Sequence, residues 1–484
     1  MKTTNLAQLI VQRATEDPSL RIGVVGDLIT LADATGNAAA FGEGLAAERD
    51  GRTDPIAMVA HSSTDFLVAW MACQLHGIPV ALINPDYPDE LLGEMLASFA
   101  PSLIATDSPS RFGDGVPILD IATARSQSAN VGHELPGWTT KGYETSSYMH
   151  TSGTTGLPKF CAQSHEYFLR LGRVVAAGLQ LTAGDTVFAP LPLFHVNPLG
   201  YGVVGALTAG AHALSAERFS ASGFWPILKA HGVTSVVLHE PPVQILKQTT
   251  TAHDARGHQL KSMFYTDAEF LATYDVPLAM SVYGSTEAGG ISHVKTWQVG
   301  DAIPGNAGRI GGTVRGDLEW RLSDSGEIQL RERERGALFT GYRRSDALDT
   351  ARDAEGWFST GDLGERSESG ELVFIERAAE AIRVKGEFVP VQHVEGVLSA
   401  AAPTGDVVIW KQSSALVDDE VVAYVDGDEI PRRELATAIS SLPKFMRPKS
   451  VVRVGGIPRD TVAGKVRRRL LPSQDVLEKW EVPL

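Results

Sequence analysis

The chain has 484 residues, of which 43% are hydrophobic and 21% are charged, an ordinary composition for a soluble globular protein. This length exceeds a single compact core and predicts roughly three packed units. Acidic residues outnumber basic ones by 58 to 43, so the formal charge of −15 opposes non-specific binding to nucleic acid or to an anionic membrane.

The lack of a predicted secretory signal and the cysteine usage are typical of a protein in a reducing compartment. Residues 1–18 have no uninterrupted apolar core of the kind found in a secretory signal, and no run of about 18 apolar residues predicts a membrane span. The two cysteines, Cys73 and Cys161, are far apart and lack metal-ligand spacing, so we interpret both as small buried apolar side chains. These observations together predict a cytoplasmic protein with no nucleic-acid partner.

The first part of the chain alternates short apolar runs with helical patterns. Apolar residues at helical spacing predict a helix that begins at Leu6, with Thr4 or Asn5 as its cap. A second helix follows the polar cluster at 62–65 and ends near Gly77. Buried strands are predicted at 56–60, 78–83, 102–106, 186–189 and 233–238. This order of strand, helix and strand is typical of a parallel α/β layer.

The pattern of predicted elements changes after residue 376. A polar turn at 376–380 precedes predicted strands at 407–410 and 421–425 and a helix at 432–442. We therefore predict a small α+β domain over 377–484, joined by a hinge to a larger domain over 1–376.

The stretch at 148–159, YMHTSGTTGLPK, combines glycines with small hydroxylated residues and ends in a lysine. Backbone N–H groups and hydroxyls in such a loop can approach a polyphosphate closely, and the lysine adds positive charge. The spacing does not match the common P-loop, so a different phosphate-binding architecture is predicted. A surface turn without a ligand is the alternative explanation.

Three later stretches carry further candidate groups. In SVYGSTEAGG at 281–290, Tyr283 can stack on a base and Glu287 can hold Mg²⁺ against phosphates. In STGDLG at 359–364, we expect Asp362 in a tight turn, where it can accept hydrogen bonds from ribose hydroxyls. In PRDTVAGKVRRRL at 458–470, a glycine precedes Lys465. Three of these groups also have a purely structural explanation: Glu287 as a helix-start carboxylate, Asp362 as a turn former and Lys465 as a surface lysine.

Taken in chain order, five stretches resemble the adenylate-forming (AMP-binding) superfamily, which includes acyl-CoA synthetases, luciferases and peptide-synthetase adenylation domains. They are TSGTTGLPK at 151–159, PLPLFH at 190–195, YGSTE at 283–287, STGDLG at 359–364 and PRDTVAGKVRRRL at 458–470. The resemblance extends from about Leu6 to Leu470. It implies an α/β fold, with a large N-terminal region of parallel-rich sheets and helices in several subdomains and a small mobile α+β C-terminal domain.

The resemblance also implies roles for individual residues. The phosphate loop, which grips the β- and γ-phosphates of ATP, would comprise Thr151, Ser152, Gly153, Thr154, Thr155, Gly156 and Lys159. The remaining matches are Glu287 for Mg²⁺, Thr286 near the α-phosphate, Tyr283 and Gly284 at adenine, Asp362 and Arg377 at ribose, Lys465 as the mobile catalytic lysine and His195 beside the carboxylate pocket. Ala379 stands at the hinge position, where the family usually has Asp or Lys.

The implied activity is that of an ATP-dependent carboxylate ligase. Its carboxylic acid would become an acyl-AMP with release of pyrophosphate, and the acyl group would then pass to an acceptor, first of all the thiol of coenzyme A. No acid occurs at 194–197, where relatives that activate α-amino acids carry an aspartate, so we expect a carboxylic acid without an α-ammonium group. The mostly apolar, glycine-rich segment 197–203 is consistent with an aryl or medium acyl group.

Several departures from the family pattern concern the acceptor step. The proline of the segment that follows the hinge, Pro390, comes one position early, and His393 stands where a glutamate is usual. Phe160 and His150 also replace the residues common at their positions. Transfer to a free amine, which would form an amide, therefore remains an alternative. A nucleotide-binding protein without catalysis is a third reading, against which Glu287, Asp362 and Lys465 argue together.

Overall fold

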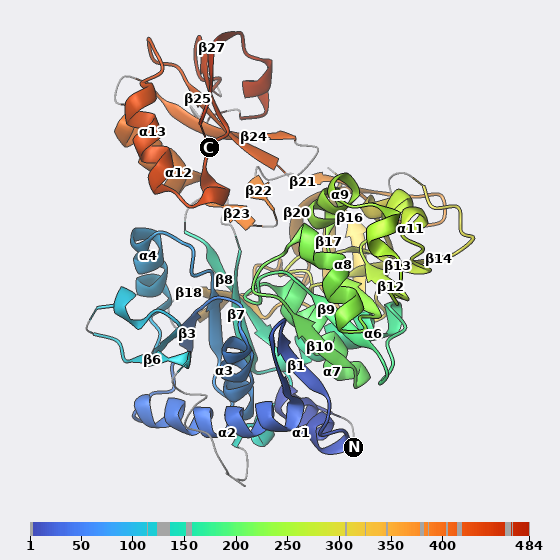
Figure 1. Cartoon of the computed structure of the whole chain (residues 1–484). Coiled ribbons are helices and arrows are strands. Elements are labelled where there is room, and N and C mark those ends of the chain that lie inside the picture. The colour runs from blue at the N-terminus through green and yellow to red at the C-terminus, as the bar shows by residue number, and fades with distance from the viewer. Residues whose placement is uncertain are drawn as a thin grey trace. The chain divides into compact units, whose positions relative to one another are not determined.

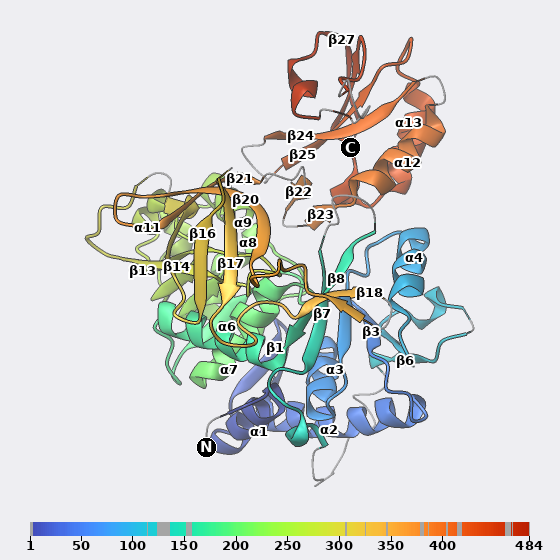
Figure 2. The same ribbon diagram turned by 180° about the vertical axis from the view of Figure 1, so that it is seen from behind.

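The computed structural model describes residues 3–113, 115–122, 136–151, 157–304, 307–324, 326–344, 347–377, 382–385, 387–402, 405–413, 419–459, 466 and 468–483 (Figures 1 and 2). The chain forms two compact units. The first contains Met1–Pro85, Leu96–His150 and Phe160–Glu376, and the second contains Asp86–Met95, Thr151–Lys159 and Arg377–Leu484.

The first unit is built on two sheets. The thirteen-stranded sheet has the order β16 (Leu318–Leu322), β17 (Glu327–Glu332), β20 (Phe358–Arg366), β21 (Leu372–Arg377), β15 (Ile310–Val314), β14 (His293–Gln298), β13 (Leu278–Tyr283), β12 (Ser262–Phe264), β11 (Ser235–Val237), β9 (Thr186–Ala189), β10 (His212–Ser215), β1 (Arg21–Val24) and β2 (Asp27–Thr30). The eight-stranded sheet has the order β19 (Ala347–Asp349), β18 (Gly341–Arg344), β8 (Lys159–Ser164), β7 (Thr145–Thr151), β4 (Val80–Ile83), β3 (Ile56–Val59), β5 (Ile104–Thr106) and β6 (Ile118–Asp120).

Helices connect and cover these strands. They are α1 (Leu6–Glu16), α2 (Leu31–Glu48), α3 (Thr64–Leu75), α4 (Asp89–Phe99), α6 (His165–Gly178), the π-helix η3 (Asn197–Val204), α7 (Gly205–Ala209), α8 (Ala221–Ala230), α9 (Glu240–Thr249), α10 (Ala252–Ala255) and α11 (Ala268–Thr273). The two helices predicted for this part of the chain are confirmed as α1 and α3. Asn5 caps α1 by accepting a hydrogen bond from the N–H of Gln8 at 2.9 Å, and Ser63 caps α3 through the N–H of Phe66 at 3.0 Å.

The middle strands of the large sheet are buried on both faces. Along β9, Val187 and Ala189 belong to one hydrophobic cluster with α6, η3 and α7, whereas Phe188 belongs to another with α8, α9 and α11 (Figure 1). Such two-sided burial is expected for parallel strands joined by helical crossovers. From β10 to β13 the neighbouring strands run parallel, so their carboxyl ends meet at one edge. Ligands of open α/β sheets bind at such an edge.

The expectation of three packed units is wrong. Both sheets of the first unit contribute to the same hydrophobic cluster, which contains Met58 and Leu82 of the smaller sheet together with Val187 and Ala189 of the larger one. A shared core makes the two sheets one compact unit. The predicted α/β class is confirmed, and Cys73 and Cys161 are both buried, as predicted.

The second unit has a four-stranded sheet of order β24 (Val407–Ser413), β25 (Asp419–Val425), β26 (Ser450–Val454) and β27 (Val476–Glu481). It also contains the hairpin of β22 (Ile382–Val384) and β23 (Glu387–Val389), and the helices α12 (Val391–Ala401) and α13 (Arg432–Ser441). The part of α4 up to Met95 belongs to this unit as well. Its core includes Trp410, Tyr424 and Val452. No helix in the described part of either unit is long and apolar enough to cross a bilayer.

Two local expectations are corrected. Asp362 does not lie in a tight turn but within β20, where the pairing with β17 shifts register, and Gly361 at φ +75° accommodates the irregularity. The polar segment at 376–380 begins as the end of β21, which continues to Arg377, and residues 378–380 lie outside the described ranges.

A glycine in η3 lets this helix approach the sheet. A Cβ at Gly202 would overlap the Cβ of Ala189 in β9, and that atom is fixed by the strand backbone. In contrast, nothing lies within 4 Å of a Cβ built at Gly44 in α2.

We expect Gly202→Ala to lower the stability of the first unit by about 1–3 kcal/mol, because the extra methyl overpacks the core. The matched variant Gly44→Ala should instead raise stability by about 0.5–1 kcal/mol, since alanine is the better helix former. Thermal and urea unfolding of both full-length variants would measure the difference. Equal effects of the two substitutions would contradict the close packing of η3 on β9.

Candidate active site

The turn after β13 is the centre of the candidate site. It begins at Gly284, where a Cβ would overlap the carbonyl oxygen of Gly290, so the turn folds closely onto itself. Within the turn, the N–H of Gly290 donates to the carbonyl of Ser285 at 2.9 Å. Thr286 and Glu287 are half-buried, which leaves their side chains partly accessible at the edge of the sheet.

A buried guanidinium holds the far side of this turn. Arg315, only 6% exposed, donates through Nη1 to the carbonyls of Gly289 at 3.1 Å and Ile291 at 2.6 Å. It also pairs with Asp317, with Nε–Oδ1 at 2.9 Å and Nη2–Oδ2 at 2.8 Å. Burial raises the pKa of the Asp317 carboxyl, but hydrogen bonds and charge from Arg315 and Arg170 outweigh burial and bring this pKa below its usual value.

Two buried tyrosines fix other carbonyls of the turn. Tyr167 of α6 donates its hydroxyl to the carbonyl of Thr286 at 3.0 Å, and Tyr201 of η3 donates to the carbonyl of Gly290 at 3.0 Å. Burial raises the pKa of Tyr167 well above its usual value, so its hydroxyl remains a donor at neutral pH. The turn is thus held from two helices as well as from Arg315.

The carboxylate of Glu287 accepts a hydrogen bond from the hydroxyl of Tyr342 at 3.0 Å. The backbone carbonyl of Glu287 accepts another from the N–H of Phe339 at 3.1 Å. Phe339 lies just before β18 and Tyr342 within it, so side chain and backbone of Glu287 are positioned by the same stretch of chain.

Tyr283 and Asp362, both predicted at the nucleotide, are in direct contact. The hydroxyl of Tyr283 donates to Oδ2 of Asp362 at 2.9 Å, and the two residues are 6% and 4% exposed. The Tyr283 ring stacks on Phe374 with centroids 6.0 Å apart. Asp362 therefore lies at the end of β13, although it is far from Tyr283 in sequence.

A cluster of rings surrounds the predicted acid-pocket residue His195. The centroid of His195 lies 4.6 Å from that of Phe194 and 6.2 Å from that of His150. Nε2 of His150 accepts a hydrogen bond from the N–H of Asn84 at 3.3 Å. Burial, followed by the charge of His195, lowers the pKa of His150 to about 3, so this imidazole is neutral at physiological pH.

The predicted phosphate loop is described only at its ends. Thr151 is the buried last residue of β7, and Lys159 is the half-buried first residue of β8. Ser152, Gly153, Thr154, Thr155, Gly156 and Lys465 lie outside the described residues. Arg377 is the last residue of β21, and Gly284 is exposed.

Four residues that hold the turn were not predicted from sequence: Tyr167, Tyr201, Arg315 and Tyr342. Three of them lie in α6, η3 and β18, Arg315 directly follows β15, and none belongs to one of the five family motifs. The only local signal for these residues is that Arg315 and Asp317 are two residues apart, and on its own this spacing indicates an ordinary ion pair.

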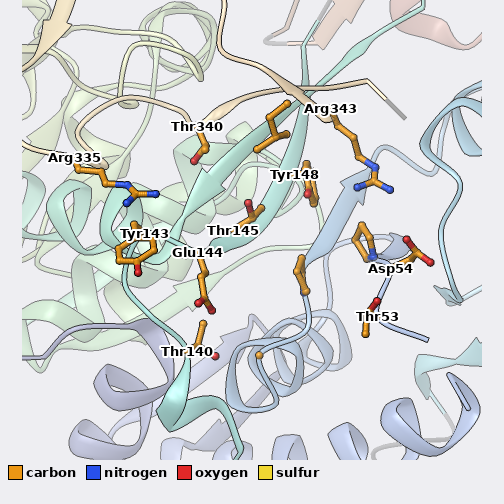
Figure 3. A pocket seen from close by; sticks show the side chains of 14 residues that line it. Thr53, Asp54, Thr140, Tyr143, Glu144, Thr145, Tyr148, Arg335, Thr340 and Arg343 are labelled. Carbon is orange, nitrogen blue, oxygen red and sulfur yellow. The ribbon is translucent and has the colours of Figure 1, made fainter. Parts of the chain in front are cut away.

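A separate depression of about 560 Å³ lies elsewhere on the first unit (Figure 3). At one end Arg335 covers the ring of Tyr143, with its guanidinium carbon 3.9 Å from the centroid, and Arg343 lines the other end. Asp54 and Glu144 also line it, so the formal charges of the two arginines are balanced. None of the predicted site residues lines this depression, which we therefore do not assign to the nucleotide.

Comparison with known proteins gives a consistent picture. A family model described as AMP-binding enzyme matches residues 11–342. The 4-coumarate–CoA ligase 3 of Arabidopsis thaliana is 24% identical over 480 residues, which cover 87% of this chain and 82% of that protein. A medium/long-chain-fatty-acid–CoA ligase of Mycobacterium tuberculosis is 25% identical over 517 residues, which cover 94% and 83% respectively.

Solved structures share the fold. A double mutant of o-succinylbenzoate CoA synthetase from Bacillus subtilis, bound to a product analogue, superimposes with a TM-score of 0.85 at 21% identity and covers 99% of this chain and 100% of its own. The same enzyme in complex with its acyl-adenylate intermediate gives a TM-score of 0.69 at 20% identity, covering 100% and 99%. Since the family model matches more than half of the chain, including β13 and the turn that follows it, this chain belongs to the AMP-binding enzymes and is an adenylate-forming ligase.

Proposed function

We propose that this ligase converts a carboxylic acid without an α-ammonium group into its acyl-adenylate, with release of pyrophosphate, and then transfers the acyl group to the thiol of coenzyme A. The observation that carries the proposal is the end of β13, where the Tyr283–Asp362 pair adjoins the rigidly held turn with the half-exposed side chains of Thr286 and Glu287.

The nucleoside would bind at the Tyr283–Asp362 pair. A carboxylate is a strong acceptor for two neighbouring hydroxyls, and the bond from Tyr283 fixes the direction of the Asp362 side chain before the ribose arrives. Gly284 is exposed and has no side chain, so adenine can approach the backbone closely there.

Glu287 would hold Mg²⁺ together with the phosphates. No group of three or more His, Cys, Asp or Glu side chains that could form a metal site occurs among the residues with described positions. A single half-buried carboxylate still fits Mg²⁺, because this ion keeps several waters and is commonly bound by one or two carboxylates plus substrate phosphates. When bound, the ion supplies positive charge against the triphosphate.

The chain's own residues would then bring two anions together. A carboxylate oxygen of the substrate attacks the α-phosphorus, the bond to the bridging oxygen breaks, and pyrophosphate leaves. Thr286 would lie beside the α-phosphate, the loop at 151–159 would bind the departing phosphates, and Lys465 would offset the charge of the attacking carboxylate. Preorganised donors of this kind stabilise a transition state by several kcal/mol in total. Each donor raises the rate by a factor on the order of 10²–10³.

In the second half-reaction the coenzyme A thiolate attacks the acyl carbon, and AMP leaves with the electrons of the anhydride bond. We propose that the domain over 377–484, which carries Lys465, rotates relative to that over 1–376 between the two steps, as in the family it resembles. Identical domain orientations in crystals of the adenylate complex and the acceptor complex would refute this rotation.

The surroundings of His195 support an aryl or acyl acid. Phe194 and the neutral imidazole of His150 offer ring faces without charge, and no carboxylate at 194–197 could pair with a substrate amine. The names of the relatives support a thioester product, since both curated ligases above form CoA esters according to their descriptions.

The acceptor is tested by product analysis. Purified enzyme with Mg·ATP and a panel of aryl and acyl acids should release pyrophosphate and, on addition of coenzyme A, form a thioester that mass spectrometry identifies. Free amines offered in place of coenzyme A should give no comparable product. An amide without any thioester would establish the amine alternative. If the protein binds nucleotide but releases no pyrophosphate from ATP with any of the acids, it is a non-catalytic nucleotide-binding protein.

The variant Lys465→Ala should slow pyrophosphate release by about 10²–10³-fold, because a charge that acts mainly in the transition state is lost. Calorimetry should show ATP affinity within a few-fold of the wild type. Lys479→Ala is the matched control from the same unit, since Lys479 is a half-exposed surface lysine paired with Glu481 at 2.7 Å. Unchanged turnover of Lys465→Ala would overturn the catalytic assignment.

The ribose contact is tested by a pair of ligands. Removal of both ribose hydroxyls, in 2′,3′-dideoxy-AMP, should weaken binding to the wild type by about 10-fold or more, because hydrogen bonds to a charged group are each worth roughly 1.5–3 kcal/mol. Asp362→Asn, which keeps the side-chain shape, should bind AMP more weakly and lose most of that discrimination. If the variant discriminates between the two nucleotides as strongly as the wild type, Asp362 does not contact the ribose.

A further inference from the structure

Tyr342 connects the candidate metal carboxylate to a different sheet. Glu287 lies in the turn after β13 of the thirteen-stranded sheet, whereas Tyr342 lies in β18 of the eight-stranded sheet. The hydroxyl of Tyr342 donates to Oε1 of Glu287 at 3.0 Å. One side-chain hydrogen bond therefore joins the two sheets at the carboxylate.

The segment 337–342, which we call the crossing segment, is anchored at both of its ends. At its start, the carbonyl of Ala337 accepts a hydrogen bond from Nη2 of Arg315 at 3.2 Å. At its end, the N–H of Thr340 donates to the carbonyl of Ala162 at 2.8 Å, and Tyr342 lies opposite Cys161 in the pairing of β18 with β8. The crossing segment thus transmits the position of β8 to the turn that carries Glu287.

The ring of Tyr342 is held by its own segment. It packs edge-on against Phe339, with centroids 4.9 Å apart and an interplanar angle of 65°. Phe339 is fully buried, and its carbonyl accepts a hydrogen bond from Nη2 of Arg352 at 2.7 Å. Because the ring is packed and the backbone is anchored, the hydroxyl has a defined direction toward Glu287.

We propose that Tyr342 is a positioning residue for metal-dependent nucleotide binding, an inference that rests on the proposed role of Glu287. Its hydroxyl holds the Glu287 carboxylate in one orientation before Mg·ATP binds, so less conformational entropy is lost on binding. A neutral donor suits this task better than Lys or Arg, since a cation would offset the charge that attracts Mg²⁺. Partners that orient a metal ligand typically contribute 10–100-fold to metal affinity.

The test measures binding rather than turnover. Calorimetry without any carboxylic acid would give ATP affinity in the presence of saturating Mg²⁺ and again in EDTA, and the ratio of the two affinities isolates the contribution of the metal. Tyr342→Phe removes only the hydroxyl and should lower that ratio by about 10-fold, while affinity in EDTA stays within about twofold. The midpoint of thermal unfolding would report whether the variant remains folded.

Tyr201→Phe is the matched control, because it removes a hydroxyl bonded to the backbone of the same turn, at Gly290. Any loss of support for the turn should lower the two affinities by the same factor, so that their ratio stays constant. An equal loss of affinity with and without Mg²⁺ in Tyr342→Phe would show a merely structural role and overturn the proposal.

Glu287→Gln separates this inference from the function on which it rests. If Glu287→Gln leaves the ratio unchanged, the proposed metal role of Glu287 fails, and the role of Tyr342 fails with it. If Glu287→Gln lowers the ratio but Tyr342→Phe does not, only the role of Tyr342 fails. In the double variant, Tyr342→Phe should have no further effect on the ratio, because its action passes through the carboxylate.

Discussion

The geometry of the site depends on one buried cation, the guanidinium of Arg315. A buried charge is costly unless it is paired and hydrogen-bonded, and Arg315 meets both conditions through Asp317 and three backbone carbonyls. Two of these carbonyls belong to the turn after β13 and the third to the crossing segment. Arg315 thereby fixes the distance between the two stretches that position Glu287, and the side chains of Thr286 and Glu287 remain at the partly accessible surface.

Much of the fold follows from local sequence. Helical spacing and capping residues predicted α1 and α3, and short apolar runs predicted β3, β4 and β9, because both kinds of signal lie within about a dozen residues. The expectation for Asp362 failed for an instructive reason. The residues around Gly361 are of the types common in turns, but the neighbouring strand β17 pairs with β20 on both sides of them. The glycine therefore allows a register shift inside a strand.

The site was predictable only in part, since its motifs mark residues but not their partners. Tyr283 and Asp362 were each expected near the nucleotide, yet their hydrogen bond joins β13 to β20 across a tertiary contact. Tyr342 carries no local signal, and the spacing of Arg315 and Asp317 indicates only an ordinary ion pair. The segment 197–203 was expected beside the acid, and the structure shows that Gly200 and Gly202 in it allow close packing against Leu171 and Ala189. A small residue in a sequence indicates space, and only the structure says whether a neighbour fills it.

The link between β18 and β8 also bears on how the protein is made. Gly341 pairs with Ala162, so β8 lacks its neighbour on that side until the ribosome has produced nearly three quarters of the chain. During that interval β8 is an edge strand with unpaired backbone groups, which is the kind of surface through which nascent chains associate wrongly. Contacts of such long sequence separation also form slowly. The pairing that joins β18 to β8 in the finished protein therefore leaves an exposed strand edge for much of its synthesis.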